Sequence, residues 1–364
     1  MFRVYVTVLS IGFVALIAAL LLNSRVLEPF TGDLTRIGGL SEADYGWTLP
    51  QLRFDQPQYV YTTQLPLPAG PWDVVVFGDS FTDPDRPSAP WLDFVASRSG
   101  WRTVAVRYRS VEQIESYLDS TAFRQRPPRL VIVESVTRNM AYRLAQGDCV
   151  SQQSAESAHP ARVDAASVAP AAVAREHARR TDFADTLERL NVSSYLVRQK
   201  LMYSVLPRTS PVRSYSLERR DLFSSRRSDQ VLYYASDVEG QRVPGHQVAA
   251  FVCTLEHFRR LALGNGSTRF LFLPALDKSV AYAAYAAQPP FGPPAGYDEL
   301  KLALGPDFID TLPLLRAALT RGAPDLYLPN DSHWGSKGAL LVAEAVLAAS
   351  TELTSSSPAR EGVN

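Results

Sequence analysis

A serine directly follows a short apolar run, and an acid and a histidine lie close together far downstream. The run Val74-Val75-Val76-Phe77 leads into Gly78-Asp79-Ser80-Phe81-Thr82, and the later segment reads Asn330-Asp331-Ser332-His333-Trp334. A serine hydroxyl is a weak nucleophile until a base removes its proton and a third group orients that base. Ser80, His333 and Asp331 are the residue types for these three roles. The pattern therefore predicts acyl-transfer chemistry, in a hydrolase or an acyltransferase.

The serine segment taken alone is also typical of an ordinary turn closed by an aspartate side chain. The histidines narrow the choice, because only His333 has an acid two residues before it. The other histidines are His159, His177, His246 and His257. Gly78 allows the chain to turn sharply where the strand ends, and a backbone N–H at such a junction can bind an oxyanion.

The composition indicates a large, electrically neutral protein. The chain has 364 residues, 46% of them hydrophobic, which is enough for a sizeable core. Its 37 basic and 37 acidic residues cancel, so no overall field favours a nucleic-acid partner. No group of cysteines and histidines has zinc-ligand spacing, so we expect no metal and no cofactor.

The amino terminus has no charged residue from Val4 to Leu22. About 19 residues at about 1.5 Å each nearly match a hydrocarbon core of roughly 30 Å, which predicts a transmembrane anchor over residues 1–27. A cleaved signal peptide is the alternative, although its apolar core is usually shorter. Residues 28–70 are punctuated by glycine and proline and are expected to form a tether that packs partly on the domain.

Alternating strands and helices are expected over residues 71–350, as in a doubly wound α/β domain with a parallel sheet. The expected strands are Val74 to Phe77, Thr103 to Tyr108, Leu130 to Val133 and Phe270 to Leu273. The expected helices are Trp91 to Arg98, Val111 to Phe123, and a final helix from about Ser336 through Val346. Ligands of such folds bind beyond the carboxyl ends of the strands. Residues 351–364 are expected to be a disordered tail.

The sequence changes character over residues 141–256, which we interpret as a mainly helical insertion. Ser151 to Ala174 is rich in alanine and serine, and Asp185 to Leu206 has the spacing of a helix that could cover the mouth of the sheet. Val231 to Tyr234 and Gln241 to Val243 could pair as a hairpin. The insertion is either a lid over the substrate or a purely structural elaboration.

Two further features have alternative interpretations. Cys149 and Cys253 flank the insertion and could form a disulfide in an extracytoplasmic protein, or could be separate small apolar residues. The loop from Tyr282 to Tyr297 is rich in aromatic residues and proline. It could offer tyrosine faces to a sugar, or it could be a plain surface loop.

The segments Phe77-Gly78-Asp79-Ser80-Phe81 and Asp331-Ser332-His333-Trp334 resemble the SGNH (GDSL) hydrolase superfamily. Within it they are most similar to polysaccharide O-acetyltransferases of the alginate type, whose acid and histidine are written Asp-x-His-Trp. Val131-Ile132-Val133-Glu134 with Arg138 is similar to that group's strand ending in glutamate. Leu273-Pro274 with Lys278 and Tyr282 is similar to its strand-Pro-Lys-Tyr segment.

The chain departs from the pattern in two places. Most SGNH hydrolases have the acid three residues before the histidine, where this chain has Asn330, so the acid role passes to Asp331. In the alginate proteins the Asp-x-His-Trp segment precedes the serine, whereas here the serine comes first. The chain therefore resembles an unpermuted form of that catalytic domain.

The resemblance implies a three-layer SGNH-like fold and transfer of acetyl groups to a polysaccharide or oligosaccharide through an acetyl-serine. It also implies a single-pass protein of the bacterial inner membrane that faces the periplasm or cell exterior, with acetyl supplied by a membrane-embedded acyltransferase partner. The alternatives are an acetylesterase with the same triad, and an inactive polysaccharide-binding scaffold. The candidate oxyanion or substrate residues are Gly78, Asp79, Arg138, Asn139, Lys278, Tyr282 and Trp334. Structural roles are the alternative for three of them: Arg138 could pair with Glu134, Lys278 could be an ion-pair partner, and Trp334 could pack on the final helix.

Overall fold

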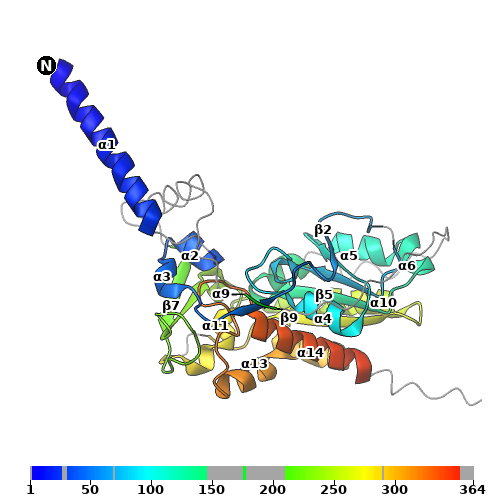
Figure 1. The fold of residues 1–364 in the computed structure, drawn as a ribbon. Helices are drawn as coiled ribbons and strands as arrows, with labels where there is room; N and C mark the ends of the chain where they lie inside the picture. The colour runs from blue at the N-terminus through cyan, green and yellow to red at the C-terminus, as the bar shows by residue number, and fades with distance from the viewer. Residues whose placement is uncertain are drawn as a thin grey trace, which may run out of the picture.

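The computed structural model describes residues 2–26, 31–68, 70–145, 175–177, 210–288 and 291–352, with side chains of the first segment described to residue 18. A parallel sheet of five strands in the order β2-β4-β3-β5-β9 lies at its centre (Figure 1). These strands are β2 (Val60–Thr62), β3 (Val74–Gly78), β4 (Thr103–Arg107), β5 (Leu130–Val136) and β9 (Arg269–Ala275). The prediction of an α/β fold around a parallel sheet is confirmed.

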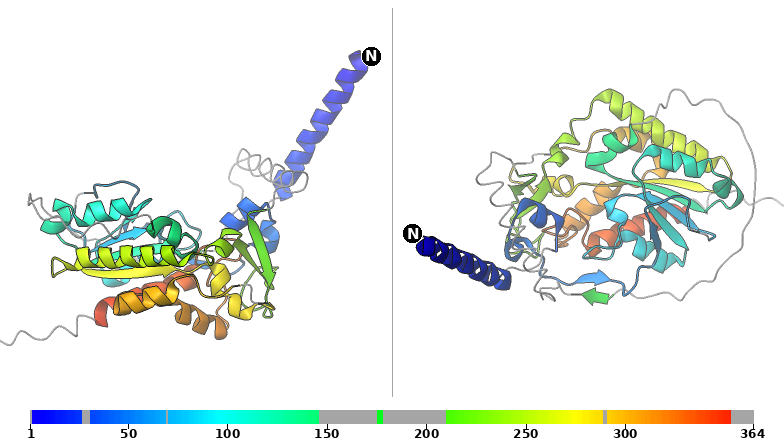
Figure 2. Two further views of the ribbon diagram at one scale, coloured as in Figure 1. Left: turned by 180° about the vertical axis from the view of Figure 1, so that it is seen from behind. Right: turned by 90° about the horizontal axis from the view of Figure 1, so that it is seen from above.

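Helices cover both faces of this sheet, which is compatible with a three-layer α/β fold. α4 and α13 pack with α14 on one face, and α5 packs with α10 on the other (Figures 1 and 2). The helices are α1 (Phe2–Val26), α2 (Asp33–Gly38), α3 (Glu42–Tyr45), α4 (Trp91–Ser99), α5 (Val111–Leu118), α6 (Thr121–Gln125), α7 (Met140–Leu144), α9 (Ser236–Glu239), α10 (Gly245–Leu263), α11 (Lys278–Ala281), α12 (Tyr297–Leu304), α13 (Thr311–Thr320) and α14 (Ser336–Glu352). The short 3-10 helices are η1 (Ser80–Thr82), η2 (Thr137–Asn139), η3 (Ala283–Tyr285) and η4 (Gly305–Asp307).

The central strands are apolar along their whole length because both of their faces are covered. Every residue of β3 and of β5 is buried. The carboxyl ends of parallel strands meet at one edge of a sheet, so the segments that follow them come together there. β3 leads into η1 with Ser80, β5 into η2 with Arg138, and β9 into α11 with Lys278.

Two predicted elements differ from the structure. The single helix expected over Val111 to Phe123 is two helices, because the Ser120 hydroxyl accepts a hydrogen bond from the Phe123 N–H and so begins α6. The expected hairpin of Val231 to Tyr234 is also wrong. Strand β8 (Gln230–Tyr234) pairs with β7 (Val212–Ser216) instead. The predicted partner, Gln241 to Val243, follows the short helix α9.

The first 70 residues contribute short elements to the body of the protein. β1 (Gln51–Arg53) pairs with β6 (Arg175–His177), and the Gln51 side-chain oxygen accepts hydrogen bonds from the N–H and hydroxyl of Ser336, where α14 begins. Leu34 of α2 is fully buried. The segment expected to be a tether therefore packs against the domain.

The expected transmembrane anchor is not found. Within the described part of the chain no helix is long and apolar enough to cross a membrane. A span needs about 20 mainly apolar residues, and the described side chains of α1 end at residue 18. This corrects the expectation drawn from the uncharged run at the amino terminus.

Most of the predicted insertion lies outside the described residues, including Ser151 to Ala174, Asp185 to Leu206 and Cys149. Cys253, on α10, is disulfide-bonded. Most of the predicted tail, residues 353–364, also lies outside the described residues.

The end of β3 has no room for a side chain at Gly78. A Cβ there would collide with the Thr82 side chain and lie 2.9 Å from Oε2 of Glu134. We expect Gly78→Ala to lower the free energy of unfolding by about 1–3 kcal/mol, as overpacking of a core does. Denaturant unfolding measures this, with Gly245→Ala as the control, because a Cβ at Gly245 meets nothing within 4 Å. Equal stability of the two variants would contradict the packing argument.

Candidate active site

Ser80, His333 and Asp331 form a continuous chain of hydrogen bonds. Nε2 of His333 lies 2.8 Å from the Ser80 hydroxyl, and Nδ1 lies 2.5 Å from Oδ1 of Asp331. The same Oδ1 accepts the His333 N–H at 2.9 Å. Because the carboxylate accepts a hydrogen bond from the Nδ1–H group, Nε2 carries a lone pair that is directed at the serine. The arrangement can deprotonate Ser80.

The Asp331 carboxylate is held in its charged form. Burial alone raises the pKa of this group, but the imidazole of His333, its hydrogen bonds and the guanidinium of Arg86 outweigh burial and hold the pKa of Asp331 well below its usual range. An ionised acid at this position fixes the imidazole tautomer and stabilises the imidazolium that forms when Ser80 loses its proton.

Asp79 holds the serine turn against the neighbouring strand. Its carboxylate accepts hydrogen bonds from the N–H groups of Phe81 and Val136 and from Arg143, at 3.0, 2.8 and 2.7 Å. Burial raises the pKa of Asp79, but Arg143, these N–H groups and Arg138 lower it by more. Asp79 is fully buried, so its place is beneath the serine turn rather than against a substrate.

Glu134 supports the same turn from the end of β5. Its Oε2 accepts the Asp79 N–H at 2.8 Å. Burial and the nearby charge of Asp79 raise the pKa of Glu134 well above its usual value. The alternative in which Arg138 pairs with Glu134 is not what the structure shows. Arg138 forms ion pairs with Asp277 and, at 3.8 Å, with Asp237.

The Ser80 N–H is a candidate oxyanion donor. Among the described residues it donates to no protein acceptor. Gly78 lies before it inside the buried end of β3 and serves to keep that end free of a side chain. A backbone N–H that points to no protein partner beside a nucleophile is the kind of group that stabilises a tetrahedral intermediate.

Lys278 anchors the loop that carries the acid and the histidine. Its ammonium donates to the carbonyl oxygens of Leu328, Pro329 and Asp331 at 2.9, 2.8 and 3.0 Å. Burial lowers the pKa of Lys278 to about 7, although the charges of Asp331 and Asp33 oppose that shift. An ammonium has three N–H donors, and these three carbonyls use all of them. Lys278 therefore positions the loop and does not face a substrate.

Tyr282 and Trp334 are packing residues. Tyr282 is fully buried, its ring stacks on Phe223 at 4.7 Å, and its hydroxyl accepts the Tyr327 N–H. Its ring face is therefore closed to a sugar, and Tyr297 at the other end of the predicted platform is also buried. Trp334 packs on Phe81, whose ring also lies 4.6 Å from the imidazole of His333.

Two charged residues that the sequence analysis missed lie beside His333. Oδ2 of Asp33 is 3.7 Å from Nδ1, and a terminal nitrogen of Arg86 is 3.4 Å from the same atom. Asp33 comes from α2, in the segment expected to be a tether. Its position has no sequence signal, since no motif links it to a loop about 300 residues later. Arg86 follows the serine by six residues, and its closeness to Ser80 was the only available signal.

Glu42 holds the amino-terminal segment that contains Asp33 against the loop that carries Asp331 and His333. Its carboxylate accepts the side-chain N–H groups of Asn330 at 2.8 Å and the Gly32 N–H at 3.2 Å. The Asn330 carbonyl in turn accepts the N–H groups of Leu34 and Thr35. Asn330 is therefore a structural residue that links the amino-terminal segment to the loop before α14.

Among the described residues, one group of acids and histidines could surround a metal ion. It consists of Asp33, Asp331 and His333, whose ligand atoms all lie within 4.8 Å of one another. Two ligands of one ion lie roughly 3 Å or more apart, because each bond is about 2 Å long. The direct contact of 2.5 Å between Nδ1 and Asp331 is too short for an ion to bridge. These two atoms therefore share a direct hydrogen bond.

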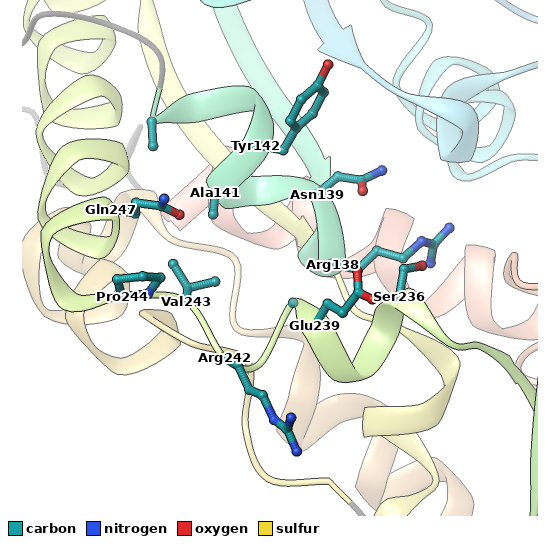
Figure 3. Close-up of a pocket in the computed structure, with 12 residues that line it drawn as sticks. Arg138, Asn139, Ala141, Tyr142, Ser236, Glu239, Arg242, Val243, Pro244 and Gln247 are labelled. Atoms are coloured by element: carbon teal, nitrogen blue, oxygen red, sulfur yellow. The ribbon is translucent and has the colours of Figure 1, made fainter. Parts of the chain in front are cut away.

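A cavity of about 510 Å³ opens beside η2, α7 and α9, and Figure 3 shows its lining. Asn139, Tyr142, Arg242 and Gln247 contribute polar groups to it. Arg138 also lines it and adds its charge to those acting on Asp79 beneath the serine turn. Of the predicted site residues, Arg138 and Asn139 thus belong to this cavity, whereas Ser80, His333 and Asp331 meet one another.

No protein family profile and no curated protein matches this chain.

The three carbonyl contacts of Lys278 indicate that this side chain stabilises the loop that carries Asp331 and His333. We expect Lys278→Met to reduce the free energy of unfolding by about 2–4 kcal/mol, because the buried carbonyls lose their donors. The reactivity of Ser80 should fall as well, since the loop then no longer holds His333. Denaturant unfolding and the rate of Ser80 labelling by a fluorophosphonate measure the two effects.

Lys301→Met is the matched control. Lys301 is exposed and pairs with Asp310 on the surface, where solvent screens the pair, so its removal should change stability little. Wild-type stability and labelling in Lys278→Met would contradict the anchoring role.

Proposed function

We propose that this protein is a serine acyltransferase of the SGNH type that O-acetylates a polysaccharide through an acetyl-serine intermediate. The observation that carries the proposal is the unbroken relay from the Ser80 hydroxyl through His333 to a buried, ionised Asp331. The resemblance of the serine segment and of Asp331-Ser332-His333-Trp334 to the alginate-type acetyltransferases gives the acyl group and the class of acceptor.

In the first half-reaction Oγ of Ser80 attacks the carbonyl carbon of an acetyl donor while Nε2 of His333 takes its proton. The Ser80 N–H stabilises the oxyanion of the tetrahedral intermediate, and loss of one such donor typically slows a reaction about 100- to 1000-fold. The imidazolium then protonates the leaving group, and the acetyl group remains on Ser80. In the second half-reaction His333 deprotonates a sugar hydroxyl, whose oxygen attacks the acetyl carbon. The bond from that carbon to Oγ of Ser80 then breaks, and the imidazolium returns the proton to Oγ.

The cavity beside η2 is the proposed acceptor site. Tyr142 is exposed and can stack its ring on a pyranose, and the amides of Asn139 and Gln247 can hydrogen-bond to sugar hydroxyls. The side-chain amide of Asn139 has no hydrogen-bond partner among the described residues, so it can do so. The cavity volume of about 510 Å³ lies in the range of small-ligand sites.

An extracytoplasmic location is part of the proposal. The disulfide at Cys253 supports it, because disulfides persist in oxidising compartments. The acetyl donor must then reach the extracytoplasmic side of the membrane. As the resemblance implies, a membrane-embedded acyltransferase partner supplies it in this proposal.

The proposal predicts that an acceptor sugar diverts acetyl from water. The purified protein is incubated with an activated acetyl ester, with and without an oligosaccharide, and acetylated sugar and free acetate are measured. We expect acetylated sugar to appear and acetate release to fall. Acetate release that oligosaccharides of several classes leave unchanged would instead assign the protein as an esterase.

The reactive serine is tested separately from the acceptor. A fluorophosphonate should label the wild-type protein at Ser80, and Ser80→Ala should abolish labelling. His333→Ala should slow labelling by at least about 100-fold, because the hydroxyl loses its base. Ser267→Ala, in an exposed turn, is the control and should label normally. Absence of wild-type labelling would favour an inactive polysaccharide-binding scaffold.

A further inference from the structure

We propose that Asp33 and Arg86 are positioning residues of opposite charge that together set the pH range in which His333 accepts the Ser80 proton. This inference rests on the proposed function, because it concerns the base of that reaction. It assigns a role in the reaction to two residues outside the serine, acid and histidine motifs.

Asp33 approaches the imidazole from α2 and is fixed there by three hydrogen bonds. Its carboxylate accepts the Ser332 N–H at 2.8 Å and the Ser332 hydroxyl at 2.6 Å, and its own N–H donates to Oδ2 of Asp331 at 3.0 Å. Its side chain is 12% exposed. The carboxylate, 3.7 Å from Nδ1, is therefore a second negative charge held beside the imidazole.

Arg86 approaches the same atom with a positive charge. Its Nε donates to the Ser80 carbonyl at 3.1 Å, which places a terminal nitrogen 3.4 Å from Nδ1. A guanidinium has only donors, and the Nδ1 proton is already directed at Asp331. The contact is thus a repulsion between Arg86 and an imidazolium rather than a hydrogen bond.

The other ionisable groups around His333 are engaged with partners. Asp83 pairs with Arg86 at 3.7 Å, Lys278 holds the Asp331 carbonyl, and Glu42 binds Asn330. Tyr234 of β8 is neutral, because burial and the charges of Asp33 and Asp331 raise its pKa. Asp331 and Asp33 therefore favour the imidazolium form of His333, and Arg86 opposes it. Removal of the charge of Asp33 or of Arg86 then shifts the equilibrium between imidazole and imidazolium in a defined direction.

The experiment compares Asp33→Asn with Arg86→Gln. The readouts are the pH dependence of Ser80 acylation by p-nitrophenyl acetate and the titration of the His333 imidazole followed by NMR. His333 must be neutral to accept a proton, so activity rises as pH rises through its titration. Removal of the Asp33 charge makes the imidazolium less favourable and moves this acid limb to lower pH. Removal of the Arg86 charge moves it to higher pH.

Each shift should be about 0.5–1 pH unit, the size expected for a partly exposed charge at this distance. Arg98→Gln and Glu344→Gln serve as controls, because they remove one positive and one negative charge from an exposed ion pair between α4 and α14. Both should leave the limb near its wild-type position. A purely structural role would lower the rate at every pH without moving the limb.

Shifts in the same direction, or no shift in either variant, would overturn the inference. The NMR titration keeps this result separate from the proposed function, because it needs no turnover. Opposite titration shifts without any acylation of the wild-type serine would reject the acyltransferase and retain the charge pair. Acylation of Ser80 without opposite titration shifts would retain the acyltransferase and reject the role of Asp33 and Arg86.

Discussion

The imidazole of His333 is the point on which the site depends, because its two nitrogens join segments that are 253 residues apart in the chain. Nε2 must meet a serine at the end of β3, and Nδ1 must meet an acid in the loop before α14. A misplacement of about 1 Å can cost a site of this kind about 100-fold in rate. The surrounding structure can be understood as the means of holding this one ring.

Buried charges supply that rigidity, and those that hold the site are paired. An isolated charge in the interior is costly, whereas a paired and hydrogen-bonded one tolerates little movement. Arg143 binds Asp79 under the serine turn, and the ammonium of Lys278 donates to three carbonyls of the loop that carries Asp331 and His333. Glu42 binds Asn330 and so brings the amino-terminal segment, with Asp33, against the same loop. The site is thus built from the first and last parts of the chain as much as from the sheet.

The sequence predicted those parts of the fold that have a local pattern. Long apolar runs identified β3, β5 and β9. The run before Ser80 marked the serine, and the acid two residues before His333 marked its partners. The short edge strand β2 had no such signal, because it forms only by pairing with β4. The contacts of Asp33 and Glu42 had none either, because each joins residues about 290–300 positions apart in the chain. Tyr282 shows the opposite error, because an aromatic residue in a loop suggested an open platform, yet Phe223 covers its ring. Composition does not distinguish a buried tyrosine from an exposed one.

The central claim is that Ser80 carries an acyl group which His333 helps to load. Rapid quenching of the protein after mixing with an activated acetyl ester, followed by peptide mass spectrometry, tests it most directly. The account predicts one acetyl group on the peptide that contains Ser80, formed faster than acetate is released in the steady state and lost in His333→Ala. Acetate release without any acetylated Ser80 peptide, or acetylation that His333→Ala leaves unchanged, would contradict it.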